Sequence, residues 1–121
     1  MYVALAEWLG GRARPRLYAA GLVAAGLIYV PFAAYAAADE WIGTELGGAL
    51  VFAALAVGGA RRYPLLTALG WGLHVGWDIL LHSGPGTGFV PGWYVPACVG
   101  FDLVVAGVIL ATSVSERDST T

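Results

Sequence analysis

Four apolar segments, each of roughly 18–22 residues, dominate this sequence and are separated by short polar or glycine-rich breaks. As helices, segments of this length match the thickness of the hydrocarbon core of a bilayer. Of the 121 residues, 59% are hydrophobic and only 12% are charged, which is too little charge to cover a soluble domain. The sequence therefore predicts an all-α membrane protein, a single domain of residues 1–121 folded as a four-transmembrane-helix bundle. The spans are predicted at residues 17–38, 41–60, 64–82 and 95–114.

The two ends of the chain lie outside these spans. Residues 1–11 carry apolar side chains near helical spacing but are too short to cross a bilayer, which predicts a short interfacial helix. Residues 115–121 form a polar tail that we expect to be disordered. The first span has an alternative interpretation as a cleaved signal peptide, with Ala34-Tyr35-Ala36 before Asp39. Its apolar stretch is longer than the usual 7–15 residues or so of such a peptide, which favours a retained span.

Small residues and one proline predict how the spans pack. Gly43-x-x-x-Gly47 in the second span and Gly72-x-x-x-Gly76 in the third are patterns that let neighbouring helices approach closely. Pro31 is expected to kink the first span toward its far end, because it removes one backbone hydrogen bond and clashes with the preceding turn.

The arginines predict the orientation of the spans. With four spans, the N-terminus, the loop after the second span and the tail share one side. That side holds every arginine of the chain: Arg12, Arg14, Arg16, Arg61, Arg62 and Arg117. The positive-inside rule then places both termini in the cytoplasm, as in a multi-pass protein of the cell membrane, with the flexible loop 83–92 outside.

The third span carries a polar stripe. His74, Asp78 and His82 are spaced four residues apart, so on a helix they lie on one face. Ionisable groups inside a span are costly and normally face a bundle interior or a water-filled cavity. The stripe therefore predicts a functional site inside the bundle.

Two other spans bring ionisable groups to a similar depth. Counted from the outer helix ends at about 1.5 Å per residue, Glu45 and Asp78 lie roughly 6 Å deep. Asp102 lies roughly 9 Å deep and His74 roughly 12 Å. No predicted span contains a lysine or arginine, so the carboxylates need protons, a protonated His74 or a bound cation. We expect His74, Asp78 and Asp102 to be catalytic residues acting on one shared ligand.

The same residues predict a metal site. His74 and Asp78, at positions i and i+4, can reach one ion, and Asp102 and Glu45 would complete a set suited to zinc, iron or manganese. His82 lies about 12 Å from His74 along the helix axis, too far to share that ion. The alternative is acid–base chemistry, in which an aspartate holds the imidazole in one tautomer.

Other polar or aromatic residues near the stripe have two interpretations each. Trp71, Trp77 and Cys98 are candidates for substrate contacts, but they also fit packing, an interfacial aromatic belt or, for the cysteine, a small apolar filler. Glu45 could extend toward the surface instead of entering a site, and His82 could be interfacial. Because Cys98 is the single cysteine, no intrachain disulfide can form.

The C-terminal half of the chain resembles a family of short, functionally uncharacterised four-helix integral membrane proteins. The matching residues are the run His74-x-x-Trp77-Asp78-x-x-x-His82, then Val90-Pro91, then Cys98-x-x-x-Asp102. In that family two adjacent histidines follow the Trp-Asp pair, whereas this chain has Leu81-His82. The resemblance implies the four-helix fold and the grouping of polar residues, and it implies no activity.

These observations favour an enzyme that acts on a lipid or isoprenoid-like substrate entering from the membrane, by acid–base or metal-assisted chemistry. A unit that transports protons, metal ions or small solutes, assembled as a homo-oligomer, is one alternative. A non-catalytic protein that binds lipid or a partner is the other. The expected partners are the bilayer and a lipid-like ligand. The chain has no basic stripe interleaved with aromatics, which argues against nucleic acid.

Overall fold

The computed structural model describes residues 1–84 and 88–120, with regular structure that is entirely helical over this part of the chain. Residues 85–87 of the predicted outer loop, and residue 121 of the predicted tail, lie outside the described residues. The all-α prediction is confirmed. The helices described are α1 (Tyr2–Leu9), α2 (Ala13–Leu27), α3 (Tyr29–Tyr35), α4 (Asp39–Arg61), α5 (Pro64–His82) and α6 (Tyr94–Thr120).

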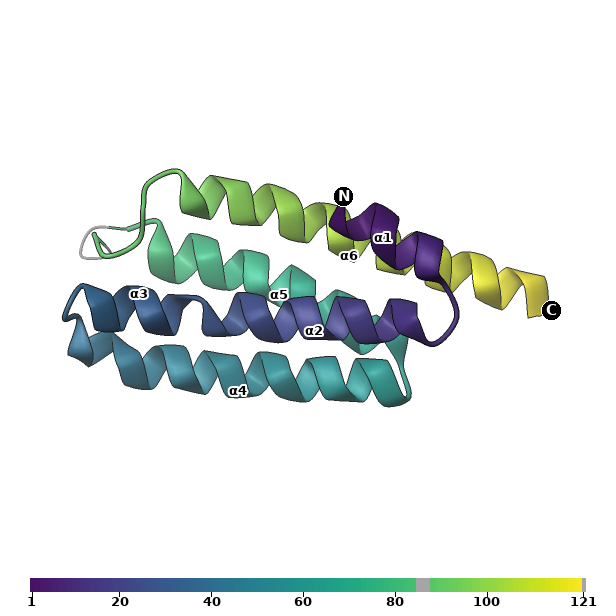
Figure 1. The fold of residues 1–121 in the computed structure, drawn as a ribbon, viewed down its shortest axis with the longest axis horizontal. Coiled ribbons are helices and arrows are strands. Elements are labelled where there is room, and N and C mark those ends of the chain that lie inside the picture. Colours follow the sequence, from purple (N-terminus) through teal and green to yellow (C-terminus); the bar gives the residue numbers. More distant parts are fainter. Residues whose placement is uncertain (85–87, 121) are drawn as a thin grey trace.

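The helices form an elongated bundle in which α2 with α3, α4, α5 and α6 run lengthwise beside one another (Figure 1). Helix α5 packs against α4, α6 and α2. Helix α1 folds back along α2, and its Tyr2 ring lies 5.5 Å from the ring of Phe101 on α6. Its predicted position at a lipid interface stays a prediction.

Among the described residues, three helical segments are long and apolar enough to cross a membrane: Ala13–Tyr35, Asp39–Arg61 and Tyr94–Ser119. They correspond to the first, second and fourth predicted spans. Helix α5, which carries the His-Asp-His stripe, has 19 residues and is long enough, but it is not among these three segments. The four-span arrangement therefore stays a prediction, whereas an all-helical chain with several candidate spans is established.

The bundle exposes many large apolar side chains and buries ionisable groups within its core. Leu50 and Leu80 are 73% and 82% exposed, although leucine is normally a core residue in water-soluble proteins. The fully buried side chains include four ionisable groups, Glu45, His74, Asp78 and Asp102. This distribution fits a bundle surrounded by lipid, where charged groups face the interior and leucines face hydrocarbon.

The first predicted span is divided into two helices at Ile28, which keeps helical backbone angles, and the kink expected at Pro31 stays a prediction. Helix α2 ends at Leu27 and α3 begins at Tyr29, with Ile28 between them. Pro31 has no N–H to donate to the carbonyl of Leu27, four residues earlier, so the break falls one turn before the proline. The interruption matters for the site, because Ala25 before the break and Tyr29 after it both contact polar side chains of α5.

The prediction of a disordered tail is wrong for the described residues, because α6 continues to Thr120. An ion-pair group joins this end of α6 to two other helices. Arg14 of α2 pairs with Glu116 of α6 and lies 3.4 Å from a carboxylate oxygen of Glu7 on α1. The Tyr18 hydroxyl donates to the same Glu7 carboxylate over 2.8 Å. These contacts give the polar end of α6 partners that a disordered tail would lack.

The two predicted glycine faces do not pack within the chain. A Cβ added at Gly43, Gly47, Gly72 or Gly76 would meet no described atom within 4 Å, apart from its own helix and neighbours. For α5 the reason is rotation: Gly72 and Gly76 each lie two residues from His74, and residues two apart on a helix point about 200° apart. Burying the His74 face therefore turns both glycines outward.

Close helix approach occurs at other glycines. A Cβ at Gly59 would lie 2.7 Å from the Thr67 backbone nitrogen, so α4 and α5 nearly touch where the chain turns between them. A Cβ at Gly48 would lie 2.4 Å from the Trp77 ring. Both glycines lie on the face of α4 that meets α5, the helix that carries the site.

Candidate functional site

Helix α5 positions the central polar stripe. His74 and Asp78 are fully buried and His82 is 4% exposed, so all three face the interior of the bundle. The expectation that this stripe lies inside the bundle is confirmed. The depth of this stripe in a membrane, and with it the interpretation of His82 as an interfacial residue, stays a prediction.

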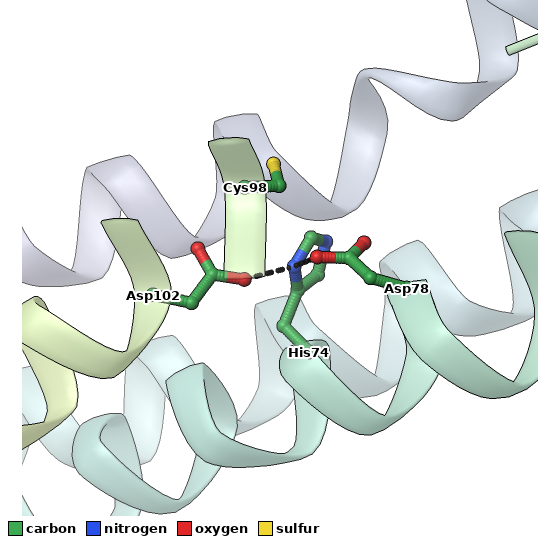
Figure 2. Close-up of side chains that lie close together, drawn as sticks. All are labelled: His74, Asp78, Cys98 and Asp102. Atoms are coloured by element: carbon green, nitrogen blue, oxygen red, sulfur yellow. Dashed lines mark hydrogen bonds and ion pairs between the residues drawn. The ribbon is translucent and has the colours of Figure 1, made fainter. Parts of the chain in front are cut away.

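His74 lies between two carboxylates (Figure 2). Its Nδ1 is 2.7 Å from Oδ2 of Asp102, which comes from α6, and 3.5 Å from Oδ2 of Asp78, one turn along α5. The α5–α6 packing thus joins the two aspartates at one imidazole nitrogen. The predicted grouping of His74, Asp78 and Asp102 matches this arrangement.

The other imidazole nitrogen fixes the tautomer. Nε2 of His74 lies 3.1 Å from the backbone carbonyl of Ala25, in the last part of α2. A carbonyl oxygen can only accept a hydrogen bond, so Nε2 carries a proton. In the neutral ring, Nδ1 is then unprotonated, and its lone pair points at the carboxylates of Asp78 and Asp102.

Tyr29 is a site residue that the sequence did not identify. It is fully buried, its hydroxyl donates a hydrogen bond to Oδ1 of Asp78, and its ring stacks on His82 with ring centroids 3.7 Å apart. A usable signal existed, because a tyrosine in the middle of an apolar span needs a partner for its hydroxyl.

Two carboxylate oxygens at the site have no hydrogen-bond donor among the described residues. They are Oδ2 of Asp78 and Oδ1 of Asp102, both fully shielded. Buried polar atoms are normally satisfied, and an exception calls for an explanation such as a bound ion or water. No arginine compensates, because the described ion pairs of arginine involve Arg14, at the far end of the bundle.

Cys98 joins the group. It lies on α6, one turn before Asp102, and its Sγ belongs with atoms of His74, Asp78 and Asp102 to a set in which all lie within 4.8 Å of one another (Figure 2). Each residue offers one potential ligand atom, and three of the four residues are buried. The group could hold a metal ion. Cys98 is therefore a further candidate ligand, and its interpretation as an apolar filler stays open.

Glu45 is not part of this group. It is fully buried, and its Oε1 lies 2.6 Å from Nε2 of His82. The Trp77 indole donates to its other oxygen over 3.3 Å. Glu45 thus pairs with His82 and lies apart from His74, Asp78 and Asp102, with which it was predicted to bind a metal. Tyr29 connects the two sets of residues, because its hydroxyl donates to Asp78 and its ring stacks on His82.

The two tryptophans near the stripe have different surroundings. Trp71 is 1% exposed, packs in the apolar core and donates its indole N–H to the Tyr18 carbonyl over 3.2 Å. Trp77 is half-buried between Glu45 and Phe52 and lines an outer groove between α4 and α5. Trp71 therefore fits the packing interpretation, whereas Trp77 borders both the interior polar groups and the outer surface.

Comparisons of the chain with protein-family models, with curated proteins and with solved structures found no significant match. The resemblance in the C-terminal half therefore stays an expectation.

Proposed function

We propose that this chain is a four-span membrane protein whose bundle holds one divalent transition-metal ion between His74, Asp78, Cys98 and Asp102. The observation that supports this proposal is the convergence of four different ligand residues from α5 and α6 at one buried point. In this proposal helix α5 also spans the membrane, as the third of the four spans, and its polar stripe faces the bundle interior instead of lipid.

The hydrogen bond from Nε2 of His74 to Ala25 supports a ligand role for Nδ1. Metal-binding histidines usually donate their other ring N–H to a carbonyl or carboxylate, which fixes the ring orientation and raises its basicity. A lone pair facing two carboxylates is repulsive unless a proton or a cation lies between them. A divalent ion would satisfy the lone pair and both unpartnered carboxylate oxygens together.

The donor set favours zinc or iron. One nitrogen, two carboxylate oxygens and one sulfur form a mixed set, and thiolate selects softer ions than manganese. In a tetrahedral zinc site the ligand atoms lie about 3.3–3.8 Å apart, given bond lengths of about 2.0–2.3 Å. The four atoms here lie within 4.8 Å of one another, so the widest separation would have to close by about 1–1.5 Å around an ion, whereas the 2.7 Å contact between Nδ1 of His74 and Oδ2 of Asp102 would have to open.

The reaction we propose is an acid–base or metal-assisted step on a lipid or isoprenoid-like substrate. A bound ion would supply Lewis-acid chemistry. Tyr29 is placed to donate a proton through its hydroxyl, and Asp78 to accept one. The apolar exterior of the bundle supports a substrate that arrives from the bilayer, because a molecule dissolved in lipid meets these helices directly.

A second candidate function, proton transfer, is favoured by one specific observation. Asp102, His74, Asp78 and Tyr29 form a continuous chain of contacts, and the Tyr29 ring stacks on His82, which pairs with Glu45. Such a chain could relay protons without a metal.

Metal analysis and cobalt substitution test the first proposal against the second. We expect the purified full chain to retain about one equivalent of zinc or iron, and the cobalt-loaded protein to show a thiolate-to-cobalt charge-transfer band. Cys98→Ser should abolish that band while Glu45→Gln, a variant of the separate pair, keeps it. If the wild-type chain binds neither ion and cobalt gives no thiolate band, the metal centre is wrong and the proton relay becomes the better candidate.

A further inference from the structure

A groove between α2 and α4 opens at the arginine-bearing end of the bundle. Its volume is about 590 Å³, within the range of roughly 300–1,000 Å³ typical of ligand sites. One end is lined by Arg12, Arg16 and Arg61, and the rest mainly by four alanines and two valines. The groove therefore combines a cationic mouth with a narrow apolar floor.

The charges of these three arginines are not neutralised by acidic side chains. In the described part of the chain, Glu7 and Glu116 both form ion pairs with Arg14. No carboxylate of the described residues lies within 4.0 Å of the charged groups of Arg12, Arg16 or Arg61. All three are exposed at the groove. Their guanidinium groups offer planar, bidentate donors of the kind that bind phosphate.

We propose that this groove binds an anionic phospholipid, with its phosphate between the three arginines and one acyl chain along the alanines of α2 and α4. Basic pockets between membrane helices bind anionic headgroups on the cytoplasmic side, which is the side predicted for these arginines. The small side chains leave space at the helix surface that a methylene chain can fill. A free phosphate ion would use only the mouth and would gain nothing from the apolar floor.

The lipid site is separate from the metal site and does not rest on it. Along α2, Arg16 lies nine residues, or about 14 Å, from Ala25, which contacts His74. A failure of the metal proposal would therefore leave this one unaffected.

The test measures lipid binding to the full chain in neutral detergent by native mass spectrometry. The probes are phosphatidylglycerol and phosphatidylcholine with identical acyl chains, and inorganic phosphate serves as a competitor. We expect the wild-type chain to prefer phosphatidylglycerol, with phosphate competing weakly. The triple variant Arg12→Gln, Arg16→Gln, Arg61→Gln should lose roughly 100-fold in affinity for phosphatidylglycerol, at about fivefold per arginine.

Two further variants separate the groove from general charge and from folding. Arg117→Gln removes one charge at the same end of the bundle but outside the groove, so it should leave binding unchanged. Ala20→Phe keeps every arginine and places a ring in the groove at an exposed position, so it should weaken phospholipid binding without changing phosphate binding. The proposal is overturned if the triple variant retains wild-type affinity or if both lipids bind equally. It is also overturned if phosphate competes fully while Ala20→Phe has no effect, because the groove would then bind anions and not lipid.

Discussion

The two ring nitrogens of His74 have different surroundings. Nε2 donates a hydrogen bond to the Ala25 carbonyl, whereas Nδ1 faces the carboxylates of Asp78 and Asp102. Since Nε2 donates to Ala25, any proton or cation shared with Asp78 and Asp102 must lie at Nδ1. The chemistry of the site therefore depends on what occupies the space between one nitrogen, two carboxylates and a thiol.

Replacing Asp102 by asparagine tests the occupant. If an ion is bound, Asp102→Asn should lose metal and become less stable, by roughly 3–4 kcal/mol when free ion exceeds its Kd by some hundreds-fold. After chelation the order should reverse, because the variant has one buried negative charge fewer than the wild type. Melting temperatures in detergent, measured with and without chelator, check both parts.

The matched control for this experiment is Glu45→Gln, which alters a buried carboxylate outside the four-residue group. It should keep the metal content of the wild type. If Asp102→Asn equals the wild type in metal content and in both melting temperatures, Asp102 has no part in a shared site.

Tyr29→Phe isolates one hydrogen bond. The substitution keeps the ring that stacks on His82 but removes the donor to Asp78, leaving a buried carboxylate oxygen without its partner. We expect a loss of about 1–3 kcal/mol in the free energy of unfolding, measured by denaturation in mixed micelles. Tyr35→Phe is the control, since Tyr35 is 96% exposed and its hydroxyl should contribute nothing. A Tyr29→Phe variant as stable as this control would show that the hydrogen bond is dispensable.

At the scale of the helices, the rotation of α5 decides which residues form the site. One face of α5 carries His74, Asp78 and His82 inward, and the opposite face presents Gly72 and Gly76 outward. The polar stripe and the glycine pair cannot both face the interior. The polar stripe does so, because exposing ionisable groups to lipid costs more than exposing glycines.

Glycine substitutions test this rotation. Gly59→Ala should destabilise the fold by about 1–3 kcal/mol, because its Cβ would lie 2.7 Å from the Thr67 backbone nitrogen, which cannot move aside cheaply. Gly76→Ala meets open space and should be neutral or slightly stabilising, since alanine favours helix over glycine. Thermal unfolding of the two variants in detergent gives the comparison. A larger loss for Gly76→Ala than for Gly59→Ala would mean that α5 is rotated differently or that a second chain covers Gly76.

At the scale of the whole molecule, the features that could be predicted from the sequence are those that depend on the spacing of residues along one helix and on the length of each apolar segment. The inward stripe of α5 follows from a spacing of four, and the break before Pro31 from a missing N–H. Contacts between helices could not be predicted in the same way, because periodicity within one helix does not say which neighbour it meets or at what height. For that reason the sequence predicts Glu45 beside His74, whereas in the structure Glu45 pairs with His82. The contact of Tyr29 with Asp78 could not be predicted for the same reason.

The predicted orientation gains support from the bundle, because the helix ends that carry the arginines all lie at one end of it (Figure 1). Cysteine labelling in intact cells with a membrane-impermeant maleimide tests it. Gly88→Cys, in the predicted outer loop, should label, and Ser119→Cys near the C-terminus should label only after permeabilisation. The wild-type chain, with Cys98 alone, gives the background. Labelling of Ser119→Cys from outside would reverse the proposed topology.

The interruption between α2 and α3 has a mechanical consequence. The two helices on either side of it contact different residues of the polar group. In α2 the Ala25 carbonyl accepts a hydrogen bond from His74, and in α3 the Tyr29 hydroxyl donates one to Asp78. A bend at Ile28 would change the distance between these two contacts, so the shape of the first span and the geometry of the polar group on α5 are linked through two hydrogen bonds.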